Sequence, residues 1–146
     1  MKSISIVYSP CKFGIVTLSL KEKLRILVVD DTATSRGLIT NALQQMGIKN
    51  YNAATDGAEA MGVLENTTYH LVSSDYNMPN MDGLELLKSM RQNPKSQRTG
   101  FIMITGTKDP GVISQGQQFG MNNYIEKPIT LNGLKACIEA VTGPID

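Results

Sequence analysis

The sequence predicts an α/β fold in which five parallel strands form a doubly wound sheet with helices on both faces. From residue 24 onward, short apolar runs alternate with longer segments whose apolar residues recur at helical spacing. The first run, residues 24–29, is almost continuously apolar, which is typical of a strand buried on both faces. Strands that alternate with helices form parallel sheets with right-handed crossovers, so few other topologies remain.

The composition is that of one ordinary globular domain. The chain has 146 residues, of which 41% are hydrophobic and 18% charged, and its net charge is +1. It has no basic block, so we expect no nucleic-acid binding. No apolar run is long enough to cross a bilayer, so we expect a cytoplasmic protein without membrane insertion. Cys11 and Cys137 lie far apart in the sequence and are expected to be free thiols.

The first half of the chain contains two strands and two helices. After the strand at residues 24–29, Thr32 or Thr34 can cap a helix, which Gly47 ends. Residues 51–55 predict a weaker strand. Asp56 and Glu59 have the spacing of a capping box and predict the start of a second helix. The apolar residues on the inner face of the first helix are Leu38, Ile39, Ala42, Leu43 and Met46.

The second half contains three further strands and three helices. Residues 71–74 predict a strand that leads directly into Asp75, and a proline-containing loop at 78–83 separates it from the next helix. Asp109 and Pro110 predict a helix start. The glycines in this fourth helix, Gly111 and Gly116, each cost roughly 1 kcal/mol relative to alanine, so we expect a weak helix. The remaining strands are expected at 101–104 and 123–126, and the last helix at 131–141.

Polar residues follow four of the predicted strands: Asp30 and Asp31, Asp75, Thr105, and Lys127. In an open α/β sheet, ligands bind in the crevice at the carboxyl ends of the strands, so these residues should meet there. Carboxylates can bind a divalent cation such as Mg²⁺, and a carboxylate can also accept a phosphoryl group. A nearby ammonium would offset the charge of that group. Taken singly, each residue could instead be an ordinary turn, strand or surface residue.

The stretch at residues 74–88 closely resembles response-regulator receiver domains, in particular the CheY-like receivers of chemotaxis. The resemblance extends from residue 24 to about residue 142. It implies the flavodoxin-like strand order 2-1-3-4-5 and a receiver domain at residues 23–146. Residues 1–22 are then a poorly packed N-terminal extension, whose two short apolar segments form at best a marginal hairpin. Because Leu18 lies where such domains usually start, we suspect an upstream start and expect residues 1–17 to be dispensable.

The resemblance also implies a role for each residue of the cluster. Asp75 resembles the phosphoacceptor. Asp30 and Asp31 resemble the acid pair that binds Mg²⁺, with Asp31 the more direct ligand. Asp75 completes the carboxylate ligands, and Asn77 resembles the residue whose backbone carbonyl completes the metal shell.

Three further residues resemble the parts of the family that sense the phosphoryl group. Thr105 and Lys127 resemble the pair that contacts it, and Tyr124 resembles the aromatic switch. From the residues alone, Tyr124 would be a half-buried strand tyrosine.

Three positions depart from the family pattern. Gly106 follows Thr105 where alanine or serine is common. Ser73 replaces a bulky apolar residue, and Thr107 occupies a position that tunes the lifetime of the phosphoryl group.

The function that the resemblance implies is that of a single-domain response regulator in a two-component system. A histidine kinase would phosphorylate Asp75, and the phosphorylated protein would bind a partner, expected to be the flagellar motor switch in chemotaxis. Because the chain ends soon after its last helix, output is expected through protein contact. A phosphatase is a further possible partner. The protein would promote its own dephosphorylation without acting on external substrates.

Two alternatives remain. The first is a relay or phosphate-sink receiver that does not act on the motor. The second is a true aspartyl-phosphate phosphatase, because the segment that begins at Asp30 and Asp31 superficially resembles the motif of such enzymes. That motif needs a second aspartate two residues after the nucleophile, and Thr32 occupies this position.

Overall fold

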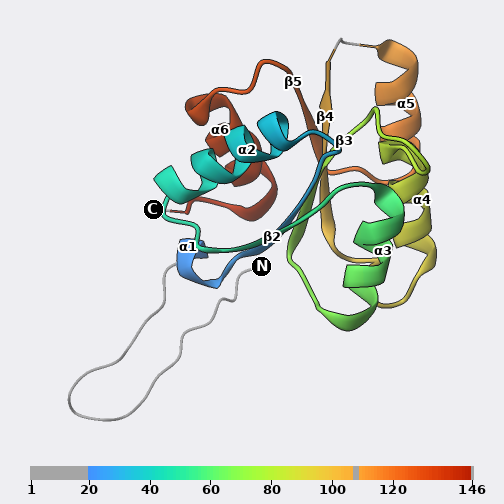
Figure 1. Ribbon diagram of the computed structural model, residues 1–146, viewed down its shortest axis with the longest axis horizontal. Coiled ribbons are helices and arrows are strands. Elements are labelled where there is room, and N and C mark those ends of the chain that lie inside the picture. Colours follow the sequence, from blue (N-terminus) through green and yellow to red (C-terminus); the bar gives the residue numbers. More distant parts are fainter. Residues whose placement is uncertain (1–19, 107–108, 146) are drawn as a thin grey trace.

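A computed structural model of the chain describes residues 20–106 and 109–145 (Figure 1). Its centre is a five-stranded sheet with the order β2-β1-β3-β4-β5, in which all neighbouring strands are parallel. The predicted fold class and strand order are therefore confirmed. The strands are β1 (Arg25–Val29), β2 (Asn50–Ala54), β3 (Leu71–Asp75), β4 (Gly100–Thr105) and β5 (Asn123–Glu126).

Helices cover both faces of the sheet. As Figure 1 shows, α2 and α6 lie on one face, and α3, α4 and α5 lie on the other. The helices are α1 (Leu20–Lys23), α2 (Ala33–Gln45), α3 (Gly57–Asn66), α4 (Gly83–Gln92), α5 (Pro110–Gln118) and α6 (Leu131–Thr142). The sequence pattern did not predict α1, although its Leu20 packs against the core. Residues 1–19, including the expected hairpin, lie outside the described residues, so the extension stays a prediction.

The alternation of side chains along β1 divides the apolar core into two layers. Ile26 and Val28 join the cluster beneath α2 and α6, whereas Leu27 and Val29 join the cluster beneath α3, α4 and α5. None of these four side chains is more than 1% exposed. The structure thus explains the almost continuously apolar run at residues 24–29 as predicted, because both faces of this strand are buried.

The capping prediction for α3 is half correct. Asp56 caps the helix and accepts a hydrogen bond from the Glu59 amide. The Glu59 carboxylate, however, accepts from the amide and the hydroxyl of Thr55, so it does not close a capping box on Asp56. The reciprocal pair lies at α4 instead, where Asp82 accepts from the Glu85 amide and Glu85 accepts from the Asp82 amide.

Helix α5 begins as predicted, since Asp109 accepts hydrogen bonds from the amides of Gly111 and Val112. Its two glycines have different surroundings. Gly111 is exposed, whereas Gly116 is buried, and a Cβ atom there would lie 2.5 Å from the sulfur of Met121. Gly116 therefore permits close packing against Met121. This packing offsets part of the stability that a glycine costs inside a helix.

Two expectations from composition concern membranes and thiols. Within residues 20–106 and 109–145, no helix is both long and apolar enough to span a membrane. Cys137 is a free, buried thiol, and burial raises its pKa to about 11. Cys11 lies outside the described residues.

Gly83 allows the start of α4 to lie against the end of β3. Its amide donates a hydrogen bond of 2.9 Å to the carbonyl of Tyr76, which closes the loop that follows Asp75. A Cβ atom at Gly83 would lie 2.7 Å from the carbonyl oxygen of Asp75 and 2.6 Å from the sulfur of Met103. Because one of these neighbours is backbone, a side chain at this position would displace the loop or the strand end.

We expect Gly83→Ala to lower the free energy of unfolding by about 1–3 kcal/mol, the usual range for overpacking. Gly62→Ala is the matched control, because Gly62 is exposed within α3 and a Cβ there would have no neighbour within 4 Å. This change should raise the free energy of unfolding by up to about 1 kcal/mol. Urea denaturation measures both. A Gly83→Ala protein as stable as Gly62→Ala would contradict the close approach of α4 to β3.

Candidate functional site

The carboxyl ends of four strands bring the predicted polar residues to one edge of the sheet. Asp30 directly follows β1, Asp75 ends β3, Thr105 ends β4, and Lys127 directly follows β5. The register pairs Val29 with Ser74 and Asp75 with Ile104, so these strand ends are level. The parallel pairing therefore places residues that are up to 97 positions apart in the sequence at one site.

Three carboxylates form the centre of this site. One side-chain oxygen from each of Asp30, Asp31 and Asp75 lies within 4.8 Å of the others. Asp30 is fully buried, Asp75 is 6% exposed, and Asp31 is exposed to solvent. Carboxylate oxygens with one solvent-facing member suit Mg²⁺, which binds few carboxylates and keeps several waters.

The first turn of α2 fixes the orientation of Asp30. Its Oδ1 atom accepts hydrogen bonds from the amide and hydroxyl of Thr32, at 3.0 and 3.3 Å. Thr32, and not Thr34, is also the cap of α2. Arg36 donates to the backbone carbonyl of Asp30 at 2.9 Å. The other carboxylate oxygen, Oδ2, is buried without a hydrogen-bond partner and faces the remaining site residues.

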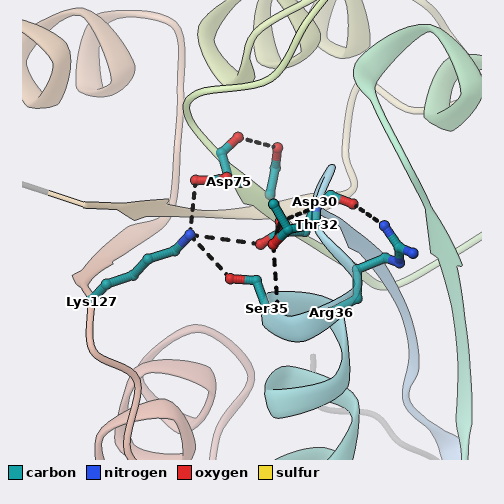
Figure 2. A network of polar contacts seen from close by, with 7 residues as sticks. Asp30, Thr32, Ser35, Arg36, Asp75 and Lys127 are labelled. Carbon is teal, nitrogen blue, oxygen red and sulfur yellow. Dashed lines mark hydrogen bonds and ion pairs between the residues drawn. The ribbon is translucent and has the colours of Figure 1, made fainter.

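Lys127 supplies positive charge between the buried carboxylates (Figure 2). Its Nζ atom lies 3.5 Å from Asp75 Oδ1 and 3.8 Å from Asp30 Oδ2, and it donates to Ser35 Oγ at 3.3 Å. The Lys127 amide also donates to the carbonyl of Thr105 at 2.8 Å, which continues the pairing of β4 with β5. The peptide bond between Lys127 and Pro128 is cis.

The surroundings of Asp75 disfavour its charged form. Burial is the main cause, and the negative charges of Asp30 and, to a smaller extent, Asp31 act in the same direction. Lys127 opposes both effects but does not cancel them, so the pKa of Asp75 is raised above its ordinary value of 3.8. Additional positive charge at this site would therefore favour ionised Asp75.

Thr105 ends β4, and Asn77 lies two residues after Asp75, in the loop that follows β3. The Thr105 hydroxyl is buried and has no hydrogen-bond partner. Thr105 and Asn77 line a cavity of about 230 Å³ between the loop after β3 and the start of α5. A buried hydroxyl without a partner costs about 1–3 kcal/mol by mutational measures, and a hydrogen bond to a ligand oxygen would offset this cost. Ser73 also has a buried hydroxyl without a partner.

Tyr124 does not join the polar contacts of the site within the described residues. It is partly buried on β5 and packs against the apolar cluster on the α5 side of the sheet. Sequence analysis missed the roles of Ser35 and Arg36. Their only signal is their position in the first turn of a helix that starts at the end of a strand. Thr107 lies outside the described residues.

Comparison with known proteins identifies the family of this domain. The model of the response regulator receiver domain family matches residues 26–139. The chain belongs to this family.

Relatives and solved structures agree with the assignment. The receiver is 41% identical to a probable chemotaxis protein CheY of Rhizobium etli, over 88% of this chain and 99% of that protein. The structure of chemotaxis protein CheY4 of Vibrio cholerae is 28% identical, with a TM-score of 0.76, over 81% of this chain and 98% of that chain. A third neighbour is the receiver domain of a Pseudomonas aeruginosa sensor histidine kinase, solved with magnesium coordinated in its active-site cleft. It is 25% identical, with a TM-score of 0.75, over 82% of this chain and 98% of that chain.

Asp75→Asn is expected to stabilise the magnesium-free receiver at neutral pH. The folded protein raises the pKa of Asp75 above 3.8, so ionised Asp75 lowers stability, and this loss develops as the pH rises through and above 3.8. An asparagine never ionises and avoids the loss. Urea denaturation in EDTA should therefore show a more stable variant at neutral pH and a difference that narrows on acidification. A less stable variant at neutral pH would mean that the pairing with Lys127 outweighs burial.

Proposed function

We propose that this receiver is a single-domain response regulator of a two-component system, and that Asp75 accepts a phosphoryl group from the phosphohistidine of a histidine kinase. The observation that carries the proposal is the position of Asp75. Its carboxylate lies at a strand end, 3.5 Å from the Lys127 ammonium and next to two further carboxylates. No other carboxylate of the described residues lies as close to this ammonium, since Asp30 is 3.8 Å away.

The transfer exchanges one bond to phosphorus for another. A carboxylate oxygen of Asp75 attacks the phosphorus atom, the P–N bond to the donor histidine breaks, and a P–O bond to Asp75 forms. The imidazole leaves with the electron pair of the broken bond. The Lys127 ammonium and the Thr105 hydroxyl would donate hydrogen bonds to oxygens of the arriving group and so stabilise its negative charge.

Asp30, Asp31, Asp75 and the backbone carbonyl of Asn77 would hold Mg²⁺. The fit is supported by the three converging carboxylate oxygens and by the unpartnered Oδ2 atom of Asp30. When bound, Mg²⁺ would supply positive charge that offsets the charge of the transferring group. Water attack on the phosphoaspartate would then return the protein to its starting state, so the chain carries a signal and does not turn over external substrates.

Phosphorylation is proposed to change the surface formed by α5, β5 and α6. Thr105 ends β4, and Tyr124 lies on β5, three residues before Lys127. A new bond from Thr105 to the phosphoryl group would alter the space beside α5 that Tyr124 can occupy. The proposed partner of this surface is the flagellar motor switch, because two relatives of this chain, from Rhizobium etli and Vibrio cholerae, are named as chemotaxis proteins. A phosphatase is a further partner, and the proposed location is the cytoplasm.

The relay or phosphate-sink alternative is kept as a second candidate, because the fold alone does not distinguish the two functions. The receiver of a sensor histidine kinase superposes about as well as CheY4, with TM-scores of 0.75 and 0.76. The two functions differ in output. Binding to purified motor-switch protein that increases on phosphorylation would support motor control, whereas equal, weak binding in both states would support the alternative.

The phosphoacceptor is tested by treating the protein with acetyl phosphate and Mg²⁺ and following its intact mass. The wild type should gain one phosphoryl group, and Asp75→Asn should gain none. Asp56→Asn is the matched control, since it removes a carboxylate outside the cluster and keeps a side chain that caps helices well. It should be modified like the wild type. An unmodified wild type, or Asp75→Asn modified to the wild-type level, would overturn the proposal.

A further inference from the structure

We propose that Ser35 is a positioning residue for phosphoryl uptake. Its hydroxyl holds the Lys127 ammonium between the two buried carboxylates and keeps it available to the arriving phosphoryl group. The inference rests on the proposed function and adds a residue, from α2, that the polar residues at the strand ends do not include.

The contact distances of Lys127 support this role. Its shortest polar contact is with Ser35 Oγ at 3.3 Å, whereas the carboxylate oxygens of Asp75 and Asp30 are 3.5 and 3.8 Å away. Charged N–H groups that bond directly to carboxylates usually lie about 2.7–2.9 Å from the oxygen. The ammonium is therefore held between the carboxylates and bonded closely to neither, and Figure 2 shows Ser35 facing it from the first turn of α2.

The surroundings of Lys127 offer few other polar partners on that side. Beside it lies a cavity of about 370 Å³, into which the lysine stem has room to move. Apart from Lys127 and Ser35, its lining is apolar, and consists of Leu38, Ile39, Pro128 and Ile129. Ser35 thus supplies the polar atom that opposes the pull of the carboxylates.

Removal of the Ser35 hydroxyl leaves that pull unopposed. The ammonium then closes on Asp75 or Asp30, because both carboxylates are buried and opposite charges attract more strongly there than in water. Bound tightly to Asp75, it covers the oxygen that must attack phosphorus. Bound tightly to Asp30, it moves away from the arriving phosphoryl oxygens. Both outcomes slow uptake without disturbing α2, in which alanine is a better helix former than serine.

The test compares initial rates of phosphoryl uptake from acetyl phosphate in the presence of Mg²⁺, followed by intact mass in quenched samples. Ser35→Ala should be about three- to tenfold slower than the wild type, the range expected for one long, partly exposed hydrogen bond to a charged group. Thr34→Ala is the matched control, since it removes an exposed hydroxyl from the same turn. It should react like the wild type.

The same change is then made in a Lys127→Ala background, where uptake is followed for longer. If Ser35 acts through the ammonium, Ser35→Ala should cause no further slowing there. Equal rates for Ser35→Ala and Thr34→Ala in the wild-type background would overturn the inference. So would a slowing that persists without Lys127, because Ser35 would then act through the helix. A wild type that takes up no phosphoryl group would instead overturn the proposed function, and this inference with it.

Discussion

The balance of charge between Asp30, Asp75 and Lys127 is the constraint on which the site depends. Two carboxylates that are almost completely shielded from water share one ammonium, which lies 3.5 and 3.8 Å from them. Buried charges without full compensation are costly, so this arrangement persists only where the surrounding fold holds each member in place. Burial, and then the charge of Asp30, raise the pKa of Asp75 despite Lys127, so positive charge from a divalent cation would favour its ionised form.

Each member of this group is held by a different part of the fold. The start of α2 orients Asp30 through Thr32 and Arg36, and the pairing of β4 with β5 positions Lys127. The tight loop closed by Gly83 limits the space around the backbone of Asp75. The strands themselves are anchored by two apolar layers, so their ends have little freedom. Rigid strands thus position the charged groups, while the adjoining loops and helices complete their contacts.

The sequence predicts the fold and the centre of the site because both follow from short, regular patterns. Asp75 could be predicted because it directly follows a buried strand and lies too far from the next helix to cap it. Asp30 and Lys127 follow from the same rule. Ser35 could not be predicted, because its contact depends on the rotation of α2 relative to a strand end 92 residues away. The hydrogen bonds from Thr55 to Glu59 and the close packing of Gly116 against Met121 likewise depend on the three-dimensional arrangement, which no local sequence pattern contains.

The central claim is that the carboxylates of this receiver form a magnesium site. Isothermal titration of Mg²⁺ into the protein at neutral pH tests it most directly, with Asp31→Ala as the variant, because Asp31 is the exposed member of the cluster and its loss should leave the fold intact. We expect saturable binding at one site in the wild type and an affinity at least roughly tenfold lower in the variant. No saturable binding by the wild type, or equal affinity in the two proteins, would contradict the claim.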